Sequence, residues 1–277
     1  MSAVIGLGSV GTALANEFKK YPQYVVYSIS VGDKRTYGKK TYIKEQRSAE
    51  QYEDKCPSMR KFFKGVKGNI LFVVDGAELV SAATLKILSY VKHCDINILY
   101  ICSESKFLSK EERLNEVAVR GVLQEYARSA VFNKMMLVDI PIVGATLSDL
   151  TVKTYHSKIR EAIVSTLHMV EVFSRTSPDL GSQREPHEAA RLVTIGCMDM
   201  STGKENMFFP LNHPREKYYY YAINENKLET DSTLLGKINE QVSKGTHENL
   251  HVSYGIYSTE YAEDYVYVVS RSSAIQK

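Results

Sequence analysis

Three glycines lie close together near the start of the chain, in Gly6-Leu7-Gly8-Ser9-Val10-Gly11. An apolar segment precedes them and a helical pattern follows, the context in which a G-x-G-x-x-G turn holds a phosphate against a helix N-terminus. Asp33 stands twenty-two residues after Gly11, where NAD-binding proteins carry an acidic residue that contacts the ribose. The pattern predicts either nucleotide binding at Gly6, Gly8, Ser9 and Gly11, or glycines that serve only close strand–helix packing.

The residues from His247 to His251 spell H-E-x-x-H, the pattern of zinc-dependent proteases. That chemistry requires both histidines one turn apart on a helix, with the glutamate as general base. Here Gly245 ends the preceding helical pattern, and the residues from Leu250 to Ile256 alternate as in a strand. In a strand the two histidines lie about 13 Å apart, so the sequence predicts no metal site.

Composition and charge exclude several classes of protein. Hydrophobic residues make up 44% and charged residues 24% of 277 residues, as in a globular protein with a real core. No apolar run reaches the roughly 18 residues of a membrane span, and a net charge of +3 does not predict nucleic-acid binding. The four cysteines form no C-x-x-C pair and no signal peptide is evident, so we expect a cytoplasmic protein with free thiols.

The first half of the chain alternates between strand and helix patterns. Apolar strands are expected at residues 2–5, 24–30, 69–74, 96–103 and 134–140. Helices are expected at residues 12–21, 81–93 and 110–129. Residues 33–68 carry eleven Lys/Arg and five Asp/Glu, and we interpret them as an irregular solvated loop rather than a segment that binds phosphate or an acidic partner. Apolar strands that alternate with helices predict an α/β fold with a parallel sheet covered on both faces.

The second half begins with a long helical pattern at residues 150–174. Residues 177–186 are rich in Pro, Gly and Ser and indicate a boundary. Beyond it a helix is expected at 232–243 and strands at 218–223, 251–257 and 265–270, the last two as an antiparallel pair. We therefore expect an α/β domain at 1–149, a connecting helix at 150–176 and a smaller α+β domain at 177–277.

The order of these elements resembles the tubulin/FtsZ superfamily from end to end. Residues 4–11 resemble that family's first glycine-rich phosphate loop, and residues 71–76 resemble the strand that enters its signature loop. Residues 98–113 resemble the next strand and its Arg-ending turn, and 192–198 the stretch after the catalytic loop. The closest stretch is 217–272, which resembles the family's C-terminal domain. The resemblance implies a Rossmann-type N-terminal domain, GTP as the nucleotide and assembly into polymers.

The resemblance also implies nucleotide contacts outside the first loop. Gly76 stands at the start of the signature loop, Arg113 ends the following turn, and Tyr155 matches the aromatic that stacks on guanine. However, the signature G-G-G-T-G-[ST]-G loop is replaced by residues 76–81, in which the glycines are lost and a carboxylate, Glu78, is present. We therefore expect GTP binding to be weakened or lost.

Two further departures concern base recognition and hydrolysis. Ile159 and Arg160 stand where the family recognises the base with Asn and Asp. The Asn and two acidic residues of the family's catalytic loop align with Arg184, Pro186 and Ala189. Glu185 or Glu188 could take their place only if the register of the alignment is shifted. We expect no catalytic residue and no GTP hydrolysis.

The sequence thus predicts a divergent tubulin/FtsZ-like protein, of viral or plasmid type, that acts by self-assembly or protein interaction rather than turnover. A viral member would work in the host cytoplasm. The alternative is a nicotinamide-dependent oxidoreductase that uses the glycine turn and Asp33, although no His, Lys or Tyr is placed for hydride chemistry. A third possibility is a structural subunit of this fold without any ligand.

Head-to-tail association is the expected mode of assembly, because in the family resembled one subunit covers the nucleotide face of the next. The corresponding surfaces here are residues 6–11, 76–81 and 107–113 at one end and 177–188 at the other. The first end offers Glu78, Glu111 and Glu112, and the second offers Arg175, Arg184 and His187. Opposite charges at the two ends predict association that weakens with salt.

Overall fold

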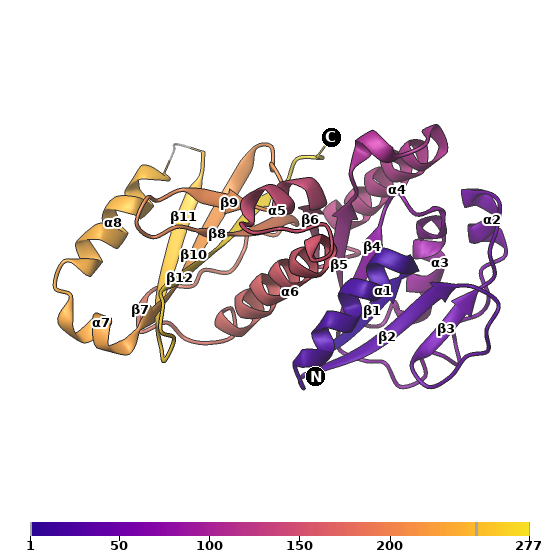
Figure 1. The fold of residues 1–277 in the computed structure, drawn as a ribbon, viewed down its shortest axis with the longest axis horizontal. Helices are drawn as coiled ribbons and strands as arrows, with labels where there is room; N and C mark the ends of the chain where they lie inside the picture. The colour runs from indigo at the N-terminus through magenta and orange to yellow at the C-terminus, as the bar shows by residue number, and fades with distance from the viewer. Residues whose placement is uncertain (1, 247–248, 277) are drawn as a thin grey trace. The chain divides into compact units, whose positions relative to one another are not determined.

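The computed structural model describes residues 2–246 and 249–276 (Figure 1). The chain divides into two compact units, residues 1–164 and residues 165–277. The boundary between the units falls inside helix α6, Tyr155–Phe173. Among the described residues no helix is both long and apolar enough to cross a membrane.

The first unit is built on a parallel sheet with the strand order β3-β2-β1-β4-β5-β6. The strands are β1 (Ser2–Leu7), β2 (Tyr24–Val31), β3 (Lys40–Ile43), β4 (Asn69–Asp75), β5 (Asp95–Cys102) and β6 (Lys134–Asp139). The sheet is buried on both faces, as the consecutive fully buried residues Ile98–Ile101 of β5 show. The predicted α/β fold with a parallel sheet is confirmed. The order of strands reverses between β1 and β4.

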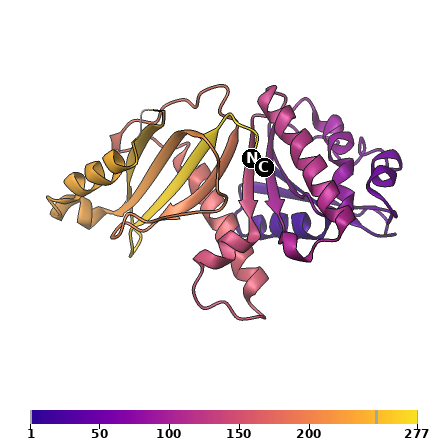
Figure 2. The same ribbon diagram turned by 90° about the horizontal axis from the view of Figure 1, so that it is seen from above.

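Helices cover both faces of this sheet, with α1 on one face and α4 on the other (Figure 2). The α-helices are α1 (Gly8–Glu17), α2 (Ala49–Asp54), α3 (Thr84–Leu88), α4 (Lys110–Arg128) and α5 (Ile140–Thr146). Short 3-10 helices are η1 (Phe18–Lys20), η2 (Leu79–Ala83), η3 (Ser89–Val91) and η4 (Ser105–Phe107). Helix α4 begins at a capping box, in which Ser109 and Glu112 satisfy each other's backbone N–H groups.

Several predicted boundaries in the first unit are wrong. Helix α1 begins at Gly8 rather than at residue 12, because the left-handed backbone of Gly8 turns the chain from strand to helix in one step. Residues 33–68 are not irregular throughout, since they contain β3 and α2. The helix expected at 81–93 is instead α3 flanked by η2 and η3.

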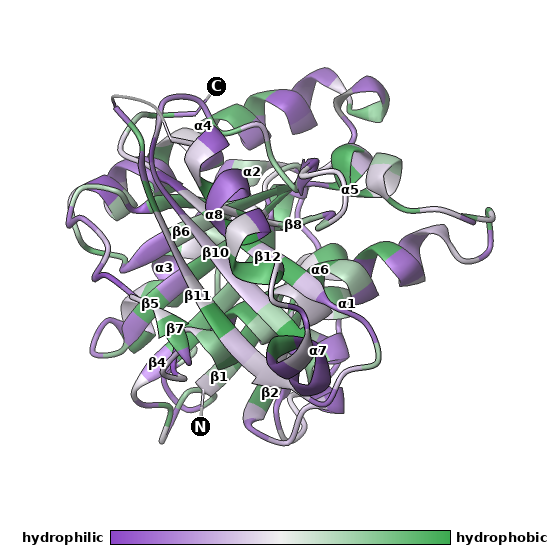
Figure 3. Ribbon diagram, turned by 90° about the vertical axis from the view of Figure 1, so that its left-hand side faces the viewer, coloured by the Kyte–Doolittle hydropathy of each residue, from purple (hydrophilic) through white to green (hydrophobic). Residues whose placement is uncertain are grey.

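The second unit contains a mixed sheet with the strand order β8-β12-β10-β11-β7, and β9 pairs with β8. Its strands are β7 (Leu180–Gly181), β8 (Leu192–Met198), β9 (Glu205–Met207), β10 (Pro214–Asn224), β11 (His251–Thr259) and β12 (Tyr265–Ser272). Two helices, α7 (Glu225–Thr230) and α8 (Leu234–Lys244), follow β10. In Figure 3 strands β10 and β11 are mostly pale, because their tyrosines are intermediate in hydropathy, whereas α7 is mainly hydrophilic.

The expected antiparallel pair of the last two strands is wrong. Strand β10 lies between β11 and β12, parallel to the former and antiparallel to the latter. The burial of these strands accounts for the order, because residues Tyr218–Ile223 of β10 are buried. The first half of β11 is partly exposed, which suits a strand that has only the two-residue β7 beyond it.

Candidate functional site

The glycine turn leads directly from strand β1 into helix α1. β1 ends at Leu7 and α1 begins at Gly8, whose φ of 77° lies in the left-handed region. Leu7 is the N-cap residue, and it has no side-chain group that caps the helix. The turn lies at the carboxyl end of β1, next to β4, where the strand order reverses. Open α/β sheets bind their ligands at such a position.

The carboxylate of Glu78 fills the N-terminus of α1. The backbone N–H of Ser9 donates to Glu78 Oε2 at 2.8 Å and to Oε1 at 3.0 Å. The backbone N–H of Val10 donates to Oε1 at 3.0 Å, and the Ser9 hydroxyl also donates to this oxygen. A Cβ at Gly8 would overlap the same carboxylate. The free N–H groups and the positive end of the helix dipole are therefore satisfied by an anion from the chain itself.

The loop that carries Glu78 is held by hydrogen bonds on its inner side. The amide of Asn115, a buried residue of α4, donates to the carbonyl oxygens of Gly76 at 2.8 Å and of Glu78 at 3.1 Å. The Ser81 hydroxyl donates to the Gly76 carbonyl at 3.1 Å, and the Ser81 N–H donates to the Glu78 carbonyl at 2.8 Å. The sequence-based site residues do not include Asn115, although an amide on the inner side of a helix is a signal of such a contact.

Asp75 fixes the beginning of this loop at the end of β4. Its carboxylate is buried and accepts from the Ala77 N–H at 2.8 Å and from the Ser103 hydroxyl. Burial raises the pKa of Asp75 to about 6, and the two hydrogen bonds only partly oppose this effect. The neighbouring carboxylates of Glu78 and Glu116 raise the pKa further. Asp75 at the end of β4 and Glu78 in the loop that follows thus both have defined places within the fold.

The other predicted glycines are explained by close packing. A Cβ at Gly6 would overlap the backbone of Gly11, and a Cβ at Gly11 would lie 2.5 Å from the carbonyl oxygen of Val73 in β4. A Cβ at Gly76 would overlap the ring and hydroxyl of Tyr100. These glycines allow α1 and the loop to approach the sheet, which agrees with the packing interpretation of the turn.

Arg113 belongs to the first turns of α4, at the carboxyl edge of the same sheet. It is exposed, and its Nε donates to the carbonyl of Leu108 at 3.1 Å. It also lines a cavity of about 540 Å³ at the ends of β5 and β6, together with an ion pair of 3.1 Å between Glu116 and Arg120. The role of Arg113 as a nucleotide contact stays a prediction.

The start of helix α6 packs against α5 and α1. Tyr155 lies against α5, since a Cβ at Gly144 would come within 2.9 Å of its hydroxyl. Ile159 is buried, and Arg160 Nε lies 3.7 Å from a carboxylate oxygen of Glu17 in α1. Ile159 and Arg160, which the resemblance aligns with base recognition, therefore take part in packing and an ion pair, while base stacking by Tyr155 stays a prediction.

The remaining predicted motifs do not converge on this turn. Asp33 is exposed, with a carboxylate oxygen 3.7 Å from Lys44 Nζ. In the loop before β8, the His187 N–H donates to Glu216 Oε1 at 2.8 Å. Of the H-E-x-x-H motif, His247 and Glu248 lie outside the described residues, and His251 begins strand β11 as expected. In the described part of the chain, no group of three or more His, Cys, Asp or Glu side chains is placed to hold a metal.

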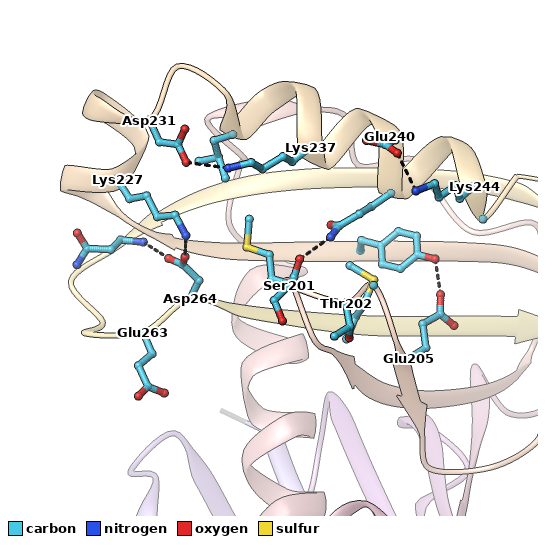
Figure 4. Close-up of a pocket in the computed structure, with 18 of the residues that line it drawn as sticks. Ser201, Thr202, Glu205, Lys227, Asp231, Lys237, Glu240, Lys244, Glu263 and Asp264 are labelled. Carbon is cyan, nitrogen blue, oxygen red and sulfur yellow. Dashed lines mark hydrogen bonds and ion pairs between the residues drawn. The ribbon is translucent and has the colours of Figure 1, made fainter.

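A second cavity, of about 1250 Å³, lies in the C-terminal unit between the sheet and helices α7 and α8 (Figure 4). Its charged rim consists largely of internal pairs, such as Lys237 with Asp231 at 3.6 Å and Lys244 with Glu240 at 2.7 Å. Tyr219 donates to Glu205 at 2.5 Å on its inner wall. Because these charged groups face one another, the cavity does not define a ligand.

Comparison with known proteins places this geometry in a fold family. Neither a protein-family model nor a curated protein matches the sequence significantly. Among solved structures, a GTPγS-form protofilament of TubZ from Bacillus thuringiensis serovar israelensis matches with a TM-score of 0.75 and 12% identity, covering 98% of this chain and 86% of TubZ. A GTPγS-bound protofilament of CetZ2 from Haloferax volcanii matches with a TM-score of 0.72 and 13% identity, over 97% and 92% of the two chains.

FtsZ of M. jannaschii matches with a TM-score of 0.64 and 10% identity, over 98% of this chain and 88% of FtsZ. The chain therefore has the tubulin/FtsZ fold, at only 10–13% sequence identity to these three proteins. The resemblance of the sequence to this superfamily is confirmed at the level of the fold.

Proposed function

We propose that this chain is a tubulin/FtsZ-like assembling protein in which Glu78, rather than GTP, supplies the anion at the start of α1. The contact of its carboxylate with the N–H groups of Ser9 and Val10 is the observation that carries the proposal. A phosphate at this turn would meet that carboxylate, and like charges repel. We expect GTP binding, and hydrolysis with it, to be lost because phosphoryl transfer requires a positioned phosphate.

Assembly is supported by the similar structures, since those of TubZ and CetZ2 are themselves protofilaments. For this chain we propose head-to-tail contacts, in which residues 6–11, 76–81 and 107–113 of one copy meet residues 177–188 of the next. The first three segments follow β1, β4 and β5, so they share the carboxyl edge of one parallel sheet. Heterologous contacts of this kind propagate into filaments.

Several of the charged residues at the two proposed ends already have partners within the chain. Glu78 binds the start of α1, and Glu112 caps α4 by accepting from the Ser109 N–H at 2.7 Å. On the other surface, Arg175 pairs with Glu171 at 3.1 Å. The electrostatic part of the proposal therefore rests on exposed Glu111 at one end and on exposed Arg184 at the other.

The alternative, a nicotinamide-dependent oxidoreductase, gains no support from the geometry. The diphosphate of a dinucleotide would meet the same Glu78 carboxylate at the turn. Asp33, its expected ribose contact, is exposed and close to Lys44 instead. A cytoplasmic location and a viral or plasmid origin stay predictions from the sequence.

Sedimentation of the full-length protein at low and high salt, with and without Mg-GTP, tests the proposal. We expect oligomers at low salt without nucleotide, no effect of GTP, and a shift toward monomer in Arg184→Glu. The matched control is Lys67→Glu, which reverses an exposed charge just before β4, at the opposite edge of the sheet. A strict monomer at high concentration would refute assembly, and assembly only with GTP would refute the role of Glu78.

A further inference from the structure

Helix α4 presents an apolar outward face that no other part of the described chain covers. Leu114, Val117 and Val122 on this face are 62%, 60% and 44% exposed, and Ala118 between them is exposed as well. The helix runs along the outside of the first unit (Figure 2). Surface helices usually place charged residues at such positions, and a contiguous apolar face indicates a contact with another molecule.

Gly121 lies in the middle of this face, and no contact within the described chain requires a glycine there. A Cβ at this position would meet nothing within 4 Å, and its φ is not in the left-handed region. Glycine in a helix costs roughly 1 kcal/mol relative to alanine. A glycine at this position would allow the backbone of a second helix to approach closely. With Ala118 one turn earlier, Gly121 forms a low point between larger apolar side chains.

We propose that this face of α4 binds the same face of a second copy in an antiparallel, twofold-symmetric pair. Antiparallel pairing about the midpoint of this face sets Ala118 level with Gly121 of the second copy, and Val117 level with Val122. It also sets Leu114 level with the aliphatic stem of Glu125. The small residues let the backbones approach, and the valines and leucines fill the space beside them. Antiparallel alignment of the helix dipoles is favourable as well.

The charges that border the face select a second copy over a charged partner. Lys110 and Glu111 lie at one end of the face, and Glu125 and Arg128 lie at the other. The face is therefore electrically neutral, and antiparallel pairing sets Glu111 level with Arg128 of the second copy. The present partner of Arg128 is Glu125, at 3.2 Å in an exposed pair that is weak and easily exchanged.

This contact goes beyond the proposed head-to-tail assembly, because a twofold contact closes on itself and links copies side by side. One helix pair buries less than the roughly 800 Å² per partner of a stable interface, so we expect weak association between free subunits. In a filament the contact is repeated along the length, and its strength is multiplied by effective concentration.

Cysteine cross-linking tests the pairing and its direction in the whole chain with Arg184→Glu, which should weaken the proposed head-to-tail contacts. Ala118→Cys lies close to the twofold axis, and we expect it to form a disulfide dimer under mild oxidation. Lys110→Cys is the matched control, because antiparallel pairing holds its two copies about 28 Å apart at 1.5 Å per residue. The chain without an added cysteine gives the background from the four native cysteines.

A second substitution separates loss of pairing from loss of folding. Gly121→Leu improves helix propensity but blocks close approach, so we expect about tenfold slower cross-linking at Ala118→Cys, with an unchanged or higher melting temperature. Leu235→Glu, at a 44% exposed position on α8, should leave cross-linking unchanged. The proposal would be overturned if both cysteine variants formed dimers, or if neither did. It would also be overturned if Gly121→Leu did not slow the cross-linking of Ala118→Cys.

Discussion

The backbone N–H of Ser9 donates a hydrogen bond of 2.8 Å to the carboxylate of Glu78, a residue 69 positions later in the chain. This contact joins the first strand–helix turn to the loop after β4, and its negative charge comes from a side chain of the protein rather than from a bound phosphate. TubZ, which has the same fold, has been solved as a GTPγS-form protofilament, whereas this chain places its own carboxylate at the positive N-terminus of α1.

Removal of the Glu78 charge should destabilise the protein. Glu78→Gln keeps the size of the side chain but replaces charge-assisted hydrogen bonds with weaker ones, and we expect a loss of about 1–2 kcal/mol in the free energy of unfolding. Urea denaturation measures this, with Glu111→Gln, an exposed acid in the first turn of α4, as the control. Equal stability of the Glu78 variant and the wild type would show that the contact contributes nothing.

Gly8 and Glu78 should be energetically coupled. Gly8→Ala places a Cβ on the Glu78 carboxylate and strains a left-handed φ, so we expect it to be destabilising in the wild type. In a Glu78→Ala background the backbone strain and a close contact of 3.2 Å with Val80 remain, but the overlap with the carboxylate is gone. A double-mutant cycle should therefore give a coupling free energy above about 1 kcal/mol, whereas additive effects would mean that the two groups do not compete for the same space.

Asn115→Ala should loosen the loop that presents Glu78. The substitution leaves the carbonyl oxygens of Gly76 and Glu78 without their amide donor, and we expect a loss of about 2 kcal/mol in the free energy of unfolding. Hydrogen exchange of the Ser9 and Val10 amides should also become faster. Unchanged exchange at these amides would show that Asn115 does not act through Glu78. Asn97→Ala, which removes a partly exposed amide at the start of β5, is the control.

Asp75 should make stability depend on pH. Its pKa is about 6 in the folded protein and near 3.8 when unfolded, so the folded state binds the proton more tightly. The resulting stabilisation is full below pH 4 and is lost as the pH rises through 6, by up to about 3 kcal/mol. Asp75→Asn should not show this loss, so its stability relative to wild type rises from pH 4 to pH 7. A difference that stays constant over this range would refute the assignment, and exposed Asp33→Asn is the control.

Much of the fold could be predicted because its signals are local. The fully apolar residues 98–101 predict a strand buried on both faces, and the helix at 110–129 agrees with the observed α4 to within one residue. The place of β10 between the last two strands could not be predicted, because strand order depends on tertiary burial rather than on sequence spacing.

The site could be predicted only in part. The glycine turn and the loss of the glycine-rich signature loop are visible in the sequence, and the repulsion between Glu78 and a phosphate follows from them. The capture of Glu78 by the Ser9 and Val10 N–H groups is invisible, because it joins segments 69 residues apart and depends on a loop held by Asn115.

The melting temperature in the presence of Mg-GTP tests the central claim most directly, because a ligand that binds only the native state raises it. For the wild type we predict no shift with GTP or with pyrophosphate. For Glu78→Ala, in which the N–H groups at the start of α1 are free to bind an anion, we predict a rise with pyrophosphate. A GTP-dependent rise in the wild type that Gly8→Val abolishes would contradict the account, since the turn would then bind the nucleotide in spite of Glu78.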